Sequence, residues 1–347
     1  MTPNPFLGVV LHTIGGLAAA SFYVPYKRVR GWAWETFWLA GGVFSWIVAP
    51  WVIAFLTTPD PLGAITGVPS AKLFWPWFFG VLWGVGGLTF GLSMRYLGIS
   101  LGYAVALGFC AAFGTLIPAI PNGKLMSMFA NVGGRVVLLG VAVCLGGIGV
   151  SGAAGHIKER EKPEDETTPE LNVRKGLVVA TFAGIMSACM AFAIQAGEPI
   201  GKRAVELGAD PIWQNTPVFI VILLGGFLTN AVWCTYLYWR NGTGRQLLDR
   251  KTPLLPNYLL CALGGTVWYL QFMFYGMGTT QMGAYNFSSW TLHMSAIVFF
   301  STLWGVALRE WRGTSLKAHL VMAAGLATLI LSILIVGYGN YLGSQSS

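Results

Sequence analysis

Charge is scarce in this sequence, and its scarcity excludes a water-soluble globular protein. Asp, Glu, Lys and Arg make up 10% of the 347 residues, whereas hydrophobic residues make up 55%, and the mean hydropathy is +0.63. A soluble globule of this size needs more charge than that on its surface. The chain is therefore predicted to be an integral membrane protein that has the lipid bilayer as a partner.

Several chemical signatures are also missing. The five cysteines lie within apolar stretches and share no pairing or metal-ligand spacing, so neither a disulfide framework nor a metal site is predicted. The sequence contains no phosphate-binding glycine loop and no HExxH motif, which argues against an ATPase or a metalloprotease. Its basic residues are scattered and form no tract, so nucleic acid is not an expected partner. We expect no cofactor and no enzymatic activity.

What the sequence does contain is a series of long apolar runs. Stretches of about 20 apolar residues cross the bilayer core as helices, because a helix satisfies its own backbone hydrogen bonds. The fold class expected is an all-α integral membrane protein with ten transmembrane helices. The predicted helices span residues 6–26, 35–57, 73–94, 97–119, 133–153, 174–196, 213–239, 257–277, 283–308 and 317–338.

The single long hydrophilic stretch divides these helices into two sets of five. Residues 154–173 are predicted to be a cytoplasmic linker between a first repeat, 1–153, and a second, 174–347. An odd number of helices per repeat requires the second copy to insert upside down, so an inverted repeat is expected. Most of the 21 Lys and Arg lie in connections after odd-numbered helices. The positive-inside rule then places both termini in the periplasm.

Glu35 is the most conspicuous polar residue, because it stands at the start of the second predicted helix. A charge costs about 2.5–3.5 kcal/mol at the centre of such a helix and less near its end, so it often marks function. One interpretation is an interface carboxylate that pairs with Lys27, Arg28 and Arg30. The other is a carboxylate that binds and releases the coupling proton. The further proton-coupling candidates are His12 and His293, which lie in the first and ninth predicted helices.

Helices eight and nine are unusually rich in polar and aromatic residues for lipid-facing helices. Aromatic faces stack on sugar C–H groups, and amide, hydroxyl and imidazole groups bind sugar hydroxyls. Helix–helix hydrogen bonds and an aromatic belt would give a similar pattern. The candidate substrate-binding residues are Tyr23, Trp34, Arg95, Trp268, Tyr269, Gln271, Asn286, Ser289, Trp290 and His293.

Segments spread over nearly the whole chain carry a family resemblance. They are Phe22-Tyr23-x-Pro25, Trp32-x-Trp34-Glu35-Thr36, Ser45-Trp46-Ile47, Pro50-Trp51, Met94-Arg95-Tyr96-Leu97-Gly98, Gly133-Gly134-Arg135, Trp268-Tyr269-Leu270-Gln271-Phe272 and Ser289-Trp290-x-Leu292-His293-Met294-Ser295. In these segments the chain resembles the bacterial L-rhamnose/proton symporter family, a ten-helix branch of the drug/metabolite transporter superfamily.

The resemblance implies uptake of L-rhamnose or a related deoxy sugar with a proton, across the bacterial inner membrane, by alternating access. In the family pattern an acidic residue stands where this chain has Asn286, which leaves the proton here to Glu35 or a histidine, or leaves transport uncoupled. The alternatives are an uncoupled sugar uniporter and an exporter of drugs or lipophilic metabolites.

Overall fold

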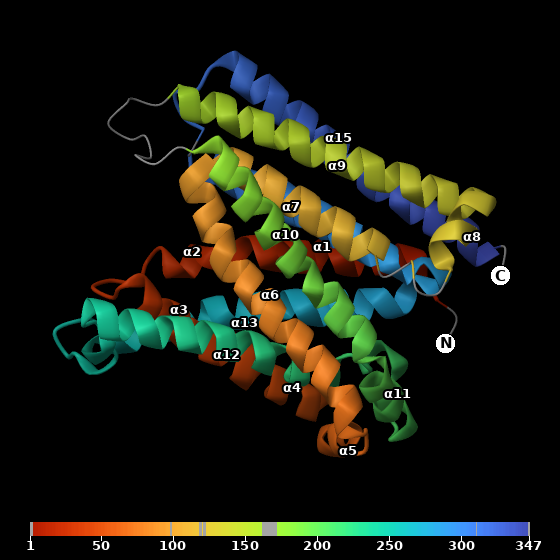
Figure 1. The fold of residues 1–347 in the computed structure, drawn as a ribbon, viewed down its shortest axis with the longest axis horizontal. Coiled ribbons are helices and arrows are strands. Elements are labelled where there is room, and N and C mark those ends of the chain that lie inside the picture. The colour runs from red at the N-terminus through yellow and green to blue at the C-terminus, as the bar shows by residue number, and fades with distance from the viewer. Residues whose placement is uncertain are drawn as a thin grey trace. The chain divides into compact units, whose positions relative to one another are not determined.

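The chain folds into helices throughout the part that the computed structural model describes, which comprises residues 3–97, 99–117, 120, 123–161, 172–309 and 311–345 (Figure 1). Within these residues, nine helical segments are long and apolar enough to cross a membrane. The fourth predicted helix corresponds to α7 (Ile99–Leu116), of which residues 105–116 form a shorter apolar stretch.

The other predicted helices are found with small shifts, and several are subdivided. The elements are α1 (Pro5–Ser21), α2 (Tyr23–Tyr26), α3 (Trp34–Gly42), η1 (Val43–Val48), α4 (Ala49–Thr57), α5 (Pro61–Thr66), α6 (Ser70–Leu97), α8 (Lys124–Ala130), α9 (Val132–Arg160), α10 (Val173–Ala196), α11 (Glu198–Glu206), η4 (Pro211–Trp213), α12 (Thr216–Asn241), η5 (Gly244–Leu248), α13 (Leu254–Gln281), η6 (Gly283–Ser288), α14 (Ser289–Ala307) and α15 (Leu316–Gln345).

These elements form two compact units, each assembled from separate stretches of the chain. Unit 1 comprises residues 1–17, 86–191 and 278–347, and unit 2 comprises residues 18–85 and 192–277. The boundaries fall within α1, α6, α10 and α13. Each unit therefore takes helices from both halves of the sequence.

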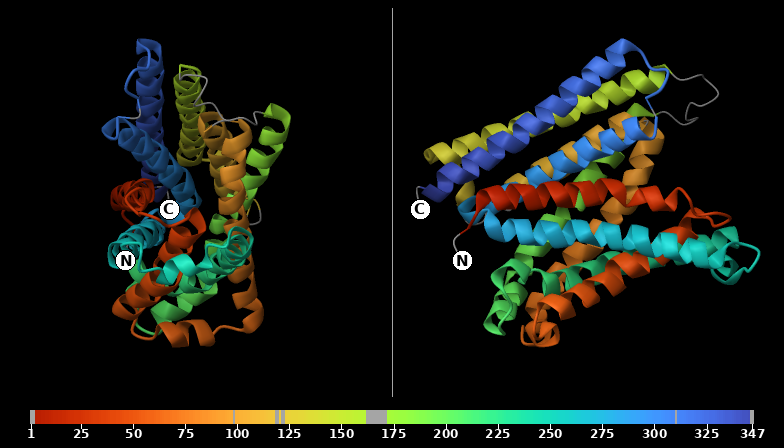
Figure 2. Two further views of the ribbon diagram at one scale, coloured as in Figure 1. Left: turned by 90° about the vertical axis from the view of Figure 1, so that its left-hand side faces the viewer. Right: turned by 180° about the vertical axis from the view of Figure 1, so that it is seen from behind.

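Unit 1 contains a long antiparallel pair, α9 and α15, which lie side by side in all views (Figures 1 and 2). Gly133 and Gly140, one heptad apart on α9, let the two backbones approach closely. A Cβ atom on Gly140 would lie 2.5 Å from Val336 Cγ2, and one on Gly133 would lie 2.9 Å from the Gly339 carbonyl oxygen. Small residues at such spacing are the usual means of tight helix packing in membranes.

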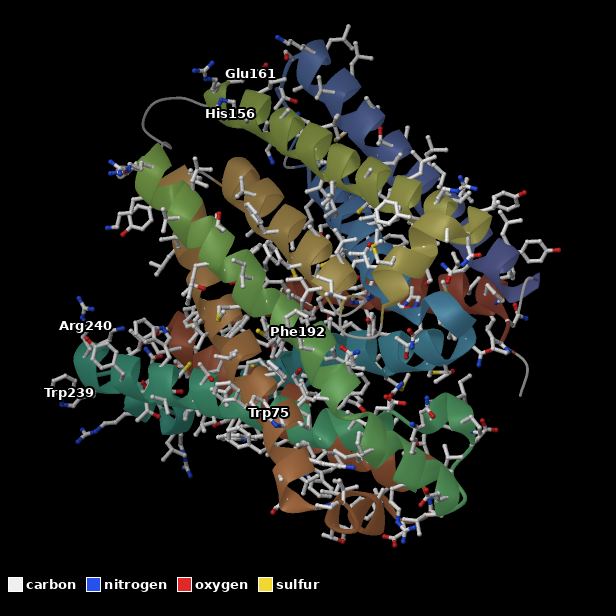
Figure 3. All side chains as sticks on the ribbon, turned by 45° about the vertical axis from the view of Figure 1, so that its right-hand side comes forward. Trp75, His156, Glu161, Phe192, Trp239 and Arg240 are labelled. Atoms are coloured by element: carbon white, nitrogen blue, oxygen red, sulfur yellow. The ribbon has the colours of Figure 1, made fainter. Side chains whose placement is uncertain are left out.

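One end of this pair is fixed by a surface carboxylate. Glu161 follows the C-terminal end of α9 (Figure 3). Its carboxylate accepts hydrogen bonds from the Ser315 backbone N–H at 2.6 Å and from Ser315 Oγ at 2.5 Å, just before α15 begins. The Ser315 hydroxyl lowers the pKa of Glu161 below its ordinary value, and the Ser315 N–H adds to the effect.

This contact predicts a pH dependence of stability. Because the pKa of Glu161 is depressed in the folded protein, its contribution is complete above the ordinary carboxyl pKa of about 4.5 and is lost as the pH falls through the folded value. Glu161→Gln should therefore lower the midpoint of thermal unfolding in detergent at pH 7. The difference from the wild type should shrink as the pH approaches 3. A pH-independent difference would contradict this account.

Unit 2 is organised around α12, which packs against α3, η1 and α4. Residues 216–223 of α12 are all buried. Side chains join the elements at the start and in the middle of α12: Thr58 Oγ1 lies 3.1 Å from Thr216 Oγ1, and Trp38 Nε1 donates to Asn230 Oδ1 at 2.9 Å. At the far end of α12, Trp239 is 82% exposed and points away from the helices (Figure 3), as an interfacial anchor does.

The second predicted helix, 35–57, contains a π-helical turn, η1, between α3 and α4. Its characteristic hydrogen bond runs from the Ala49 N–H to the Phe44 carbonyl, five residues back. Pro50 explains the turn. A proline has no N–H to donate to the carbonyl four residues earlier, here that of Trp46, and its ring crowds that carbonyl. One wider turn accommodates the proline without breaking the helix.

Candidate functional site

Aromatic side chains gather in unit 2 around Trp268 of α13. Its ring centroid lies 4.2 Å from that of Phe22, 5.0 Å from that of Trp38 and 5.5 Å from that of Trp46. Trp83 of α6 reaches Trp46 at 6.4 Å. We call these five residues the tryptophan cluster. Trp46 is 1% exposed, whereas Trp38 and Trp268 are only partly buried.

Three of the predicted substrate-binding residues belong to this cluster or touch it. Trp268 is its centre. Trp34 stacks on Trp38 at 5.0 Å with an interplanar angle of 20°, and Tyr23 packs edge-on against Phe22 at 5.8 Å. Both Trp34 and Tyr23 are 37% exposed. The aromatic surface thus runs from exposed to fully buried rings.

Two further predicted residues follow Trp268 on α13 and are buried. The Tyr269 side chain has no exposed surface, and its hydroxyl has no hydrogen-bond partner among the described residues. Gln271 is 7% exposed. Sequence reasoning missed Trp38, Trp46 and Trp83 as members of the same cluster. A signal was present for Trp38, because residues four apart lie on one helix face and Trp34 was already a candidate.

Glu35 is also in unit 2, in the first turn of α3, and is 4% exposed. Among the residues whose side chains the structure describes, it is the one Asp, Glu, Lys or Arg that is buried. Its Oε1 accepts a hydrogen bond from Thr243 Oγ1 at 2.6 Å and another from Asn241 Nδ2 at 3.0 Å. A buried carboxylate is tolerated only with such donors.

The pairing of Glu35 with Lys27, Arg28 and Arg30 stays a prediction. The hydrogen bonds described for its carboxylate come from Asn241, the last residue of α12, and from Thr243, which follows it. The backbone of Arg30 forms two hydrogen bonds with the Asn257 side chain. The Arg30 N–H donates to Asn257 Oδ1 at 3.1 Å, and Asn257 Nδ2 donates to the Arg30 carbonyl at 2.8 Å.

Further bonds tie the same segment down. Gln246 Oε1 accepts from the Ala33 N–H at 2.7 Å and from Thr36 Oγ1 at 2.9 Å, and Trp32 Nε1 donates to Thr252 Oγ1 at 3.2 Å. The start of α3, including Glu35 and Trp34, is therefore held rigidly against the chain that connects α12 to α13.

A second group of candidates lies in unit 1. His12 of α1 and His293 of α14 are 0% and 2% exposed, with ring centroids 6.5 Å apart in an edge-on arrangement. Gly278 leaves room for the His12 ring, because a Cβ atom at position 278 would lie 2.7 Å from His12 Cε1. The two imidazoles that the sequence placed in different helices are thus brought together.

Trp290 and Ser289 lie beside His293 on α14. Trp290 is 4% exposed, its ring lies 6.4 Å from that of His293, and its Nε1 donates to the Cys110 carbonyl at 3.0 Å. Ser289 is fully buried, and its hydroxyl has no partner among the described residues. Asn286, in η6, is exposed. Arg95 lies in α6, and its side chain is outside the described part.

The described residues contain no group of three or more His, Cys, Asp or Glu side chains that could hold a metal ion. All five cysteines are buried and unpaired by disulfides. What both groups offer is aromatic surface together with buried polar atoms inside apolar helices, which is how a membrane transporter binds a small polar solute.

Comparison with known proteins agrees with that class. The model of the family described as L-rhamnose-proton symport protein (RhaT) matches residues 1–341, and the chain belongs to this family. Its relatives include proteins named L-rhamnose-proton symporter from Cronobacter sakazakii (40% identity over 340 residues), Shigella sonnei (39% over 340) and Salmonella gallinarum (40% over 338). Each comparison covers 96% of this chain and 97% of the relative.

The family is one of transporters and not of enzymes. Together with the nine candidate spans, membership makes the protein a multi-pass inner-membrane protein.

Proposed function

We propose that the protein takes up L-rhamnose, or a closely related deoxy sugar, together with a proton by alternating access. The observation that carries this proposal is the match to the symporter family over residues 1–341. It is supported by relatives of about 40% identity over nearly their whole length that are named for this activity.

The sugar would bind against the tryptophan cluster of unit 2. Tyr23, Trp34 and Trp268 would supply faces for its C–H groups and its methyl group, and Tyr269 and Gln271 would bind its hydroxyls. Arg95, Asn286, Ser289, Trp290 and His293, which belong to unit 1, remain substrate-binding candidates from the sequence. Because a pocket built for particular hydroxyls leaves polar groups unpaired with the wrong sugar, epimers would be rejected.

Glu35 is the first candidate for the proton carrier, because it is the buried acidic group among the residues that the structure describes. Thr243 and Asn241 donate to its ionised form, so protonation would loosen these bonds and free the start of α3. His12 and His293 are the second candidates. Proton and sugar would be coupled if both favour the same occluded state more than either does alone.

The topology of the proposal is ten helices in two inverted repeats, 1–153 and 174–347, joined by the linker 154–173, with both termini periplasmic. This arrangement would place the protein in the drug/metabolite transporter superfamily. It is supported by the composition of the units, because the two halves of the chain contribute equally many stretches to each unit: one each to unit 2 and two each to unit 1. Two halves related by duplication would contribute matching stretches to each unit.

Transport by intact cells tests the proposal. In a strain that lacks rhamnose uptake, expression of the protein should restore accumulation of labelled L-rhamnose, and adding the sugar should transiently raise the external pH. Uptake without a pH change would indicate a uniporter. Absence of uptake together with resistance to lipophilic compounds would indicate an exporter.

A further inference from the structure

Three buried polar atoms of unit 2 stand without protein partners near the tryptophan cluster. They are Ser45 Oγ and Trp46 Nε1 in the π turn η1, and the Tyr269 hydroxyl in α13. These side chains are 0%, 1% and 0% exposed. None of the three has a hydrogen-bond partner among the described residues.

The two elements that carry these atoms are in direct contact. A Cβ atom on Gly265 of α13 would lie 3.0 Å from Phe44 Cβ in η1. One turn further along α13, the Trp268 ring lies 5.5 Å from that of Trp46. The π turn therefore packs against α13 at Trp268 within unit 2, and Tyr269 is the next residue of α13.

The Ser45 hydroxyl differs in its hydrogen bonding from hydroxyl groups in other helices of the protein. Thr13, Thr57 and Thr66 each donate to the carbonyl four residues earlier, at 2.7–2.9 Å. This back-bonding is the ordinary way for a hydroxyl to be satisfied within a helix. Ser45 Oγ makes no such bond to the Gly41 carbonyl, four residues earlier, and has no other hydrogen-bond partner among the described residues.

Unsatisfied buried polar groups are costly and are rare in native proteins. Three on facing elements need an explanation. A transported sugar supplies one, because each of its hydroxyls can both donate and accept. Trp46 Nε1 can only donate, so its partner must be an acceptor oxygen.

We propose that Ser45, Trp46 and Tyr269 form the hydroxyl-binding part of the sugar site, with the partly buried rings of Trp38 and Trp268 moving aside to admit the sugar. This inference rests on the proposed function and specifies its substrate contacts. It assigns Ser45 and Trp46, which the sequence analysis did not select as site residues. It also gives the π turn a role, because that turn carries two of the three atoms.

Conservative substitutions that remove these atoms test the inference. Ser45→Ala and Tyr269→Phe each remove one hydroxyl, and Trp46→Phe removes the indole N–H. L-Rhamnose binding to the purified full-length protein is measured by titration calorimetry, and thermal unfolding is measured without sugar. Each variant should weaken rhamnose binding by about tenfold or more. Ser45→Ala and Tyr269→Phe should leave sugar-free stability unchanged or raised, because no protein hydrogen bond is lost.

Ser332→Ala is the matched control. Ser332 is equally buried, but its hydroxyl lies 3.0 Å from Ser295 Oγ and donates to the Leu329 carbonyl at 2.8 Å. Its loss should lower stability and leave rhamnose affinity unchanged.

Two results would overturn the inference: wild-type affinity in Ser45→Ala and Tyr269→Phe, or a loss of sugar-free stability equal to that of Ser332→Ala. A wild-type protein that binds no rhamnose would instead overturn the proposed function. The stability comparison would still decide whether these two hydroxyls have protein partners.

Discussion

Replacing Glu35 with Gln is expected to abolish uphill accumulation of L-rhamnose while leaving sugar binding detectable. Gln keeps the shape of the side chain and an oxygen that can accept from Thr243 and Asn241, but it cannot take up and release a proton. A proton that crosses the full membrane potential contributes about 2.3 kcal/mol per 100 mV. Loss of coupling should therefore reduce accumulation by about fiftyfold per 100 mV.

Glu206→Gln is the control for this variant, because Glu206 is an exposed acid in the same unit that pairs with Arg203 at 2.8 Å. It should accumulate rhamnose like the wild type. Unchanged proton-driven accumulation in Glu35→Gln would remove Glu35 from the coupling mechanism. The same measurements on His12→Gln and His293→Gln would then follow.

Trp268→Ala is expected to weaken rhamnose binding by at least about tenfold. Trp268 contacts Phe22, Trp38 and Trp46, so its removal takes away both a stacking face for the sugar and the centre of the tryptophan cluster. Binding is measured by titration calorimetry, together with thermal unfolding in detergent.

Because the large truncation also leaves a cavity, Trp268→Phe is the companion variant. It keeps an aromatic face and should bind with an intermediate affinity. Trp239→Ala removes an 82% exposed ring and should bind like the wild type. Wild-type affinity in a folded Trp268→Ala protein would assign the cluster to helix packing alone.

The membrane helices could be predicted from the sequence because a run of apolar residues long enough to span the bilayer is a local property. Even the departure within residues 35–57 had a local cause, since Pro50 accounts for the π turn. The division into two units could not be predicted, because it depends on contacts between helices that are far apart in the chain.

Glu35 illustrates the same limit for the candidate site. The sequence identified it as a charge at a helix start and offered the nearby bases as partners. The donors that the structure shows are 206 and 208 residues away. Aromatic candidates were easier to select from the sequence, because a stacking contact requires only an aromatic ring. Tyr23, Trp34 and Trp268 lie in or against one cluster. Trp46 was missed because no local pattern shows that its N–H will be buried without a partner among the described residues.

Coupled movement of sugar and proton through the purified protein tests the central claim most directly. The protein is reconstituted into liposomes that are loaded with a pH-sensitive dye, with an acidic exterior. External L-rhamnose should acidify the lumen and accumulate above its external concentration, and a protonophore should abolish the accumulation. Entry of labelled rhamnose only to equilibrium, without any change in luminal pH, would contradict proton symport.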